Sequence, residues 1–276
     1  MMQDGLSDDI GQSFDLTEHY RRIVSLVPSL TETLFDLGAG ERVIARTDYC
    51  IHPADQLVTI PSVGGPKSPD LTAILALQPD LTLMDRDENR QADAQALMSA
   101  GAQVFVTFPQ TVQATLDLLW DLAALLHITA QAGPRIQTIA RAYDRTRDVT
   151  ASWPAVRVFC PIWRAPWMTF NAETYPNDLL CVCGAKNILA KHSQRYAQIT
   201  LDEVAERHPQ LILLPNEPFA FSTADAADIH THAGLSEIPI RHIDGTLLFW
   251  PGTRLAHALD QIPPLLADFR PAPATA

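Results

Sequence analysis

Residues 71–84, LTAILALQPDLTLM, have a counterpart in residues 201–214, LDEVAERHPQLILL. Each stretch has the pattern of an amphipathic helix, a turn with a proline and an apolar strand, and the two prolines align as Pro79 and Pro209. Because α/β proteins repeat this unit within one sheet, the match alone is compatible with a single domain. It nevertheless favours two similar lobes.

Residues 129–153, TAQAGPRIQTIARAYDRTRDVTASW, lie between these stretches and predict one long helix. Ile136, Ile139 and Tyr143 recur at helical spacing, and Pro134 falls in the first turns, where a missing N–H costs least. Most other side chains are polar, which is typical of a solvated helix that bridges parts of a molecule. The alternative is an ordinary surface helix of one domain.

Strands alternate with helices along the whole chain, which predicts a mostly parallel sheet in each lobe. We therefore expect an α/β fold of two similar lobes joined by one long rigid helix. The expected divisions are a flexible acidic arm at 1–20, an N-terminal lobe at 21–128, the connecting helix at 129–153 and a C-terminal lobe at 154–276.

Composition narrows the class of protein. The chain has 276 residues, of which 47% are hydrophobic, and a formal net charge of −12. This charge argues against nucleic acid and anionic membranes as partners, and no apolar run is long enough to span a membrane. The N-terminus, MMQDGLSDDIGQSFD, lacks the basic and apolar regions of a secretory signal, and the four cysteines show no disulfide spacing. These features predict a cytoplasmic protein.

Motifs for catalysis and metal binding are weak. Cys181-x-Cys183 would place two thiols on different faces of a helix, so the pair does not chelate a metal ion well. Cys50-x-His52 is better interpreted as a pair of buried or loop residues. No phosphate loop, dinucleotide-binding glycine motif or nucleophile elbow occurs. We therefore predict no catalytic residue and no metal site.

The aromatic residues are more informative, because several follow expected strands instead of lying on core faces. Ligand pockets are lined by aromatics with a few polar groups, although packing is the alternative role. The aromatics concerned are Tyr49, Trp163, Trp167, Tyr196, Phe219, Phe221 and Trp250. Lys67, Arg86 and Arg164 are loop cations that could meet carboxylates or phosphates, or could simply be solvated.

Four motifs in order, RIVSLVPSLTETLFDLGAG (22–40), LALQPDLTL (75–83), LLCVCGAKNIL (179–189) and LDEVAERHPQLILL, resemble class III substrate-binding proteins of ABC importers. This is the helical-backbone receptor superfamily for cobalamin, haem and ferric siderophores. The resemblance covers residues 21 to about 268 and is greatest to the cobalamin-binding members. It implies two α/β lobes, one rigid connecting helix and a ligand cleft between the lobes.

Position by position, the resemblance implies ligand-binding residues from both lobes. In the first lobe these are Ser29, Leu30, Thr31, Tyr49, Gly65, Pro66, Lys67, Asp85 and Arg86. In the second they are Ile162, Trp163, Tyr196, Thr246 and Trp250, to which the aromatic and cation patterns add Arg164, Trp167 and Phe219.

The chain departs from the cobalamin-binding pattern at several positions. Pro66 and Asp85 stand where tryptophans are expected, and Thr246 and Trp250 stand where an acid–arginine pair is expected. The family also presents one glutamate per lobe to its transporter. Asp202 and Glu203 fit that role in the second lobe, whereas the first lobe has Thr72.

We therefore expect a small-molecule binding protein that holds a corrinoid, such as cobalamin, or another metal chelate in the interlobe cleft without catalysis. The expected partners are this ligand and, as a candidate, an ABC importer, with no nucleic acid and no membrane insertion. One alternative is a periplasmic importer receptor for haem or a ferric siderophore. Another is an enzyme that acts on such a ligand through Asp48, His52 or Glu217.

Overall fold

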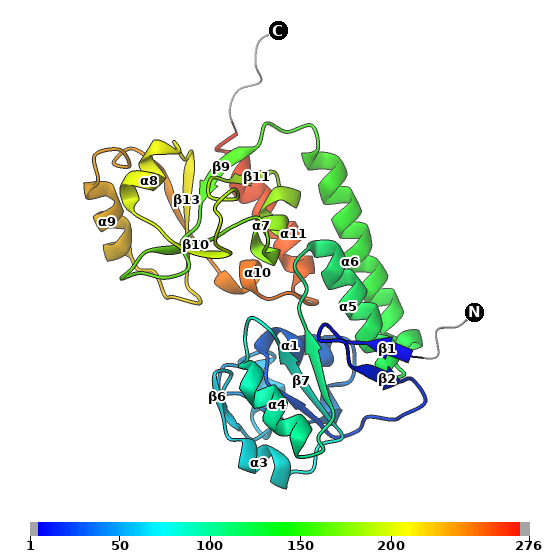
Figure 1. The fold of residues 1–276 in the computed structure, drawn as a ribbon. Helices are drawn as coiled ribbons and strands as arrows, with labels where there is room; N and C mark the ends of the chain where they lie inside the picture. Colours follow the sequence, from blue (N-terminus) through cyan, green and yellow to red (C-terminus); the bar gives the residue numbers. More distant parts are fainter. Residues whose placement is uncertain (1–4, 271–276) are drawn as a thin grey trace. The chain divides into compact units, whose positions relative to one another are not determined.

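The computed structural model describes residues 5–270, and its internal contacts divide the chain into two compact units (Figure 1). Unit 1 comprises Met1–Pro109, Gln113–Ile139 and Pro251–Arg254, and unit 2 comprises Gln110–Val112, Ala140–Trp250 and Leu255–Ala276. Each unit contains its own four-stranded parallel sheet and helices. The predicted fold of two similar α/β lobes with mostly parallel sheets is confirmed.

Unit 1 is built on a sheet with the strand order β4-β3-β7-β8. Its strands are β3 (Ile23–Ser25), β4 (Val43–Arg46), β7 (Leu81–Asp85) and β8 (Val104–Thr107). Its helices are α1 (Pro28–Asp36), the 3₁₀ turn η1 (Gly40–Arg42), α2 (Ala54–Leu57), α3 (Leu71–Ala76), α4 (Gln91–Ser99) and most of α5 (Val112–Leu125). A two-residue hairpin, β5 (Gly64–Gly65) with β6 (Ser68–Pro69), lies between α2 and α3 in sequence.

The core of unit 1 lies between this sheet and its helices. Val24 and Met84 from the strands pack with Ile74 of α3 and Leu97 of α4, and all four are buried. Helices cover both faces of a parallel sheet, so its strands are expected to be continuous apolar runs, as these short strands are.

The N-terminal segment is folded from Gly5 onward, which differs from the expected flexible arm over residues 1–20. Its strands β1 (Gly5–Ser7) and β2 (Ser13–Asp15) pair antiparallel, and the segment bonds to the edge strand β8. The backbone N–H of Asp9 donates to Val106 O over 3.0 Å, and Asp8 Oδ2 accepts from the N–H of Val106 over 3.1 Å. Acidic composition favours a solvated arm, but here the acidic side chains pair with backbone groups that an edge strand leaves open. Residues 1–4 lie outside the described part of the chain.

Unit 2 repeats the sheet with the order β11-β9-β13-β14. Its strands are β9 (Val156–Phe159), β11 (Ala185–Asn187), β13 (Leu211–Pro215) and β14 (Ile240–Ile243), with β10 (Met168–Phe170) and β12 (Tyr196–Gln198) as a separate antiparallel pair. Its helices are α7 (Tyr175–Val182), α8 (Leu201–Glu206), α9 (Thr223–Thr231), α10 (Gly245–Phe249) and α11 (Leu255–Ala267). Phe159, Val204, Ile212 and Ile229 belong to its buried core.

The long helix predicted over residues 129–153 is present as α6 (Thr129–Thr150). Ile136 and Ile139 are fully buried, as the helical spacing predicted. The contacts assign α6 to unit 1 through Ile139 and to unit 2 from Ala140, so the helix is shared instead of forming a segment of its own. The expected domain boundaries stay predictions. Within residues 5–270, no helix is both long and apolar enough to cross a membrane.

Candidate ligand-binding site

The carboxyl ends of β3, β4 and β7 meet at one edge of the unit 1 sheet, where open parallel sheets bind ligands. After β3 the chain turns into α1, and Pro28 occupies its first turn. Ser29, Leu30 and Thr31 are all buried, at 5%, 1% and 0% exposure. The Thr31 hydroxyl lies 2.8 Å from Ser25 Oγ and bonds within unit 1. The structure therefore gives Thr31 a role in holding the loop and not in facing solvent.

The loop after β4 carries the most exposed aromatic ring of the described chain, Tyr49, at 64% exposure. The ring lies against the β5–β6 hairpin, since a Cβ built on Gly65 would be 3.6 Å from Tyr49 Cε2. The N–H of Asp48 donates to Gly64 O over 2.9 Å and fixes the loop to the hairpin. Tyr49 and the Gly65-Pro66-Lys67 turn are thus brought together at this edge.

Asn89, which the sequence analysis did not single out, connects three loops at the same edge. Its Nδ2 donates to Leu26 O over 3.2 Å and to Pro66 O over 3.1 Å. Its Oδ1 accepts from the N–H of Asp85 over 2.8 Å. The available sequence signal was an asparagine four residues beyond the end of a buried strand, a position that favours a side-chain-to-backbone turn. Lys67 completes the arrangement by donating from Nζ to Asp87 O over 2.5 Å.

Asp85 stabilises this turn instead of presenting its carboxylate to solvent, since it is 7% exposed. Its Oδ1 accepts from the N–H of Asp87 over 2.8 Å, and its Oδ2 accepts from Thr107 Oγ1 over 2.8 Å. Burial raises the pKa of Asp85 to about 7 despite these hydrogen bonds. The neighbouring Arg86 is exposed, and its guanidinium lies 4.2 Å from the centre of the Phe108 ring.

In unit 2 the loop after β9 presents Trp163, which is 45% exposed. The indole meets Phe219 edge to face with ring centres 5.4 Å apart, and Phe219 comes from the loop after β13. A second layer is formed by Trp167 and Phe221, whose rings are stacked 5.9 Å apart. The N–H of Ile162 donates to Met168 O over 2.8 Å, which closes the loop that carries Trp163.

Tyr196 is the other exposed aromatic of unit 2, at 39% exposure. It is the first residue of β12 and stands opposite Phe170 of β10 in the antiparallel pair. The guanidinium of Arg195 lies 5.5 Å from its ring centre.

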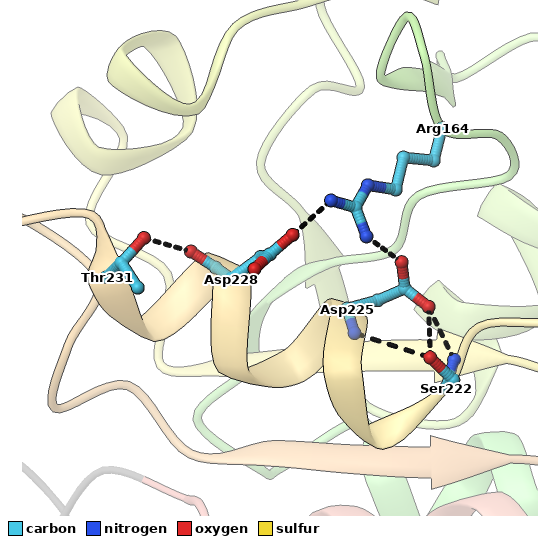
Figure 2. Close-up of polar contacts among 5 residues, drawn as sticks. All are labelled: Arg164, Ser222, Asp225, Asp228 and Thr231. Atoms are coloured by element: carbon cyan, nitrogen blue, oxygen red, sulfur yellow. Dashed lines mark hydrogen bonds and ion pairs between the residues drawn. The ribbon is translucent and has the colours of Figure 1, made fainter.

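Arg164 is tied to α9 by two carboxylates, as Figure 2 shows. Its guanidinium donates to Asp225 and to Asp228. Asp225 is 6% exposed, and burial alone would raise its pKa. The Ser222 hydroxyl and N–H, which form a capping box with it, and Arg164 instead hold the pKa of Asp225 at about 2. Arg164 thus positions the loop that bears Trp163, and its charge is already neutralised.

Thr246 and Trp250 are buried, at 5% and 6% exposure. The Thr246 hydroxyl donates to Asp244 Oδ1 over 2.8 Å, so it takes part in the cap that starts α10. Gly245 is required beside it, because a Cβ there would lie 2.5 Å from Glu217 O.

Most of the predicted site residues fall into two sets, and the remaining six are half-buried. Exposed groups at the loops include Tyr49, Lys67 and Arg86 of unit 1 and Trp163 and Tyr196 of unit 2. A second set is buried and supports these loops, namely Ser29, Leu30, Thr31, Asp85, Thr246 and Trp250. Within residues 5–270 no three histidine, cysteine or carboxylate groups lie close enough to hold a metal ion.

The sequence and the fold are similar to those of known proteins. A vitamin B12-binding protein of Yersinia pestis is 27% identical over 193 residues, which cover 70% of this chain and 69% of that protein. Two solved structures each cover 91% of this chain and 98% of their own. The periplasmic haem-binding protein RhuT of a Roseiflexus species has a TM-score of 0.78 at 20% identity, and the periplasmic vitamin B12-binding protein BtuF of Vibrio cholerae has a TM-score of 0.76 at 22% identity. Residues 23–239 match the periplasmic binding protein family. Because this match spans most of the chain, the protein belongs to the family of periplasmic binding proteins.

Proposed function

We propose that this protein binds a corrinoid such as cobalamin, and releases it unchanged, by stacking the ligand on exposed aromatic rings. The proposal rests mainly on the exposure of Tyr49, Trp163 and Tyr196, which lie in loops or at a strand end. Aromatic rings that only filled a core would be buried. A macrocycle of the size of a corrinoid offers the exposed rings a large contact area, and aromatic side chains bury about 150–250 Å² each. The vitamin B12-binding relative supports a corrinoid as the first candidate. The expectation that one ligand meets both units stays a prediction.

Haem is the second candidate, supported by the structural likeness to a haem-binding protein. Both ligands carry acidic groups, namely a phosphodiester in cobalamin and propionates in haem. Lys67 and Arg86 are exposed cations in unit 1, whereas Arg164 of unit 2 is neutralised by aspartates. Because charge-assisted hydrogen bonds are the stronger ones, we place the acidic groups of the ligand on unit 1.

The enzyme hypothesis is not favoured, because the chain belongs to a family of binding proteins. The site offers stacking surfaces and hydrogen-bonding groups. Asp85, whose pKa is raised to about 7, has both carboxylate oxygens engaged in the turn after β7.

The family and the two solved structures are periplasmic binding proteins, which supports the periplasmic alternative and does not support the cytoplasmic location expected from the sequence. We propose a periplasmic location and delivery of the ligand to an ABC importer. Asp202 at the start of α8 is the better docking acid, since its side chain is 85% exposed and bonds only to His232 among the contacts described. Glu203 is committed to the α8 capping box. Fractionation of native cells followed by blotting tests the location, and recovery in the cytoplasm would contradict it.

The function is tested by titrating the purified protein separately with cyanocobalamin and with haemin, followed by calorimetry and visible absorbance. We expect one site per chain for cyanocobalamin. Saturable binding of haemin alone would move the assignment to haem. Failure to bind either ligand would overturn the proposal.

A further inference from the structure

A cavity of about 620 Å³ lies in unit 1 beside α4. Among the residues predicted to bind the ligand, it is lined only by Asp85 and Arg86. Its volume falls in the range of about 300–1,000 Å³ that is typical of small-molecule sites. Apart from Arg86, no residue of the lining is assigned a contact with the ligand in the proposed function.

The floor of the cavity is apolar and belongs to the folded core of unit 1. Met84 of β7, Val106 of β8 and Ala94 of α4 line it, with exposures of 1%, 4% and 6%. Met98, one turn further along α4, extends this surface. Such a floor favours the hydrocarbon part of a ligand.

One wall is supplied by the N-terminal segment through Asp9 and Ile10. Ile10 is 44% exposed and places an apolar side chain at the rim of the cavity. The wall is held in place because Asp9 Oδ2 accepts from the N–H of Phe108 over 2.6 Å. This segment precedes residues 23–239, which match the family, so the wall is not part of the matched region.

The charged groups in the lining favour an anion. Among residues 5–270, neither Arg86 nor Arg90 forms an ion pair. The two acids of the lining are engaged elsewhere, since Asp9 accepts from the N–H of Phe108 and Asp85 from the turn after β7. A guanidinium offers a planar fork of donors that matches a carboxylate or sulfonate.

We propose that this cavity is a second ligand site, which binds a small organic anion with an apolar body. Arg90 holds the acidic group, and the apolar body lies over Met84 and Met98 with Ile10 covering it. Arg90, Met98 and Ile10 have no part in the proposed corrinoid site, so the two proposals are tested separately.

The probe for this site is 1-anilinonaphthalene-8-sulfonate, a fluorescent aromatic sulfonate, titrated into the full chain. Wild type should bind one probe saturably with enhanced fluorescence. Arg90→Glu and Ile10→Asp should each weaken binding by about tenfold or more. Arg90→Glu is suited to this test because an acidic residue at the start of α4 favours the helix. Ala94→Leu, which fills the floor, should also block the probe.

Two controls locate the probe. Arg145→Glu makes the same charge change on an exposed position of α6 and should leave the affinity for the probe unchanged. Trp163→Ala should leave it unchanged as well. Thermal melting of every variant checks that lost binding is not lost folding. Wild-type affinity in both Arg90→Glu and Ile10→Asp, absence of saturable binding to wild type, or loss of the probe in Trp163→Ala would overturn the proposal.

Discussion

The helix–turn–strand units α3–β7 and α8–β13 show how alike the two halves of the chain are at one end of their sheets. Both helices have six residues. Both strands have five residues, and every strand residue is buried. The residues before the aligned prolines, Gln78 and His208, both adopt the left-handed conformation with φ of 48°. This is a strained conformation for residues other than glycine, and it recurs at the same place in each unit.

The likeness extends to an arginine in each unit that closes the turn. Arg22, which precedes β3, donates from Nε to Gln78 O over 3.3 Å. Arg157 of β9 donates from Nε to His208 O over 2.8 Å. The amino ends of the two sheets therefore use the same device to satisfy a carbonyl that the turn leaves free.

The carboxyl ends of β7 and β13 differ. In unit 1 the strand runs into a polar turn built on Asp85 and Asn89. In unit 2 it ends at Pro215, and the following loop carries Phe219 and Phe221 against tryptophans. The repeat is therefore kept at the amino ends of the sheets, where it stabilises each unit, and it diverges at the carboxyl ends, where we propose that the ligand binds.

The largest expected effect tests the shared part. Leu83 of β7 and Leu213 of β13 are both fully buried and correspond in the repeat. Leu83→Ala and Leu213→Ala should each lower the free energy of unfolding of their unit by ~2–5 kcal/mol, because each leaves a cavity in the core. Urea denaturation measures this. A loss in only one of the two variants would break the comparison.

A smaller effect tests the polar turn of unit 1. The pKa of Asp85 is about 7 in the folded protein, against an ordinary value of 3.8 for an exposed aspartate. The folded state therefore binds the proton more tightly, so this group lowers stability as pH rises from about 4 through 7. Asp85→Asn keeps the side-chain shape without the charge. It should raise the free energy of unfolding by about 1–3 kcal/mol at pH 8 and change it little at pH 4.

Asp148→Asn supplies the control for this pH dependence, because Asp148 is exposed on α6. It should follow the wild-type stability profile at both pH values. If Asp85→Asn also tracks wild type from pH 4 to pH 8, the carboxyl group is not buried as described.

The smallest effect concerns the strained residues before the prolines. Gln78→Gly and His208→Gly relieve a left-handed conformation that costs about 1–2 kcal/mol, although glycine also loses more entropy on folding. Each should therefore stabilise its unit by about 0.5–1 kcal/mol. Thermal melting compares the two variants, and destabilisation by either would show that its turn depends on the side chain.

Much of this architecture was predictable from the sequence because its signals are local. The aligned prolines, the buried strands and the long helix each follow from a pattern within a few turns of chain. Tyr49 and Trp163 are likewise predictable as loop residues because they follow apolar strands.

The residues that support the loops could not be predicted in the same way, because their hydrogen-bonding partners are distant in sequence. Arg164 meets Asp225 and Asp228, 61 and 64 residues away. The acidic N-terminus pairs with β8, 98 residues from Asp8. A polar residue after a strand looks the same whether it faces a ligand or satisfies a turn, as Asp85 and Thr246 do.

We propose that residues at the carboxyl end of the unit 2 sheet bind the ligand and that residues at its amino end do not. Trp163 follows β9 and Trp153 precedes it, so the two tryptophans flank the same strand at its opposite ends. Calorimetric titration with cyanocobalamin should show Trp163→Ala weakening binding by about tenfold or more, which corresponds to roughly 1.4 kcal/mol. Trp153→Ala, which removes a ring stacked under Arg270, should lower thermal stability and leave affinity unchanged. The reverse pattern, with full affinity in Trp163→Ala and lost affinity in a folded Trp153→Ala, would contradict the account.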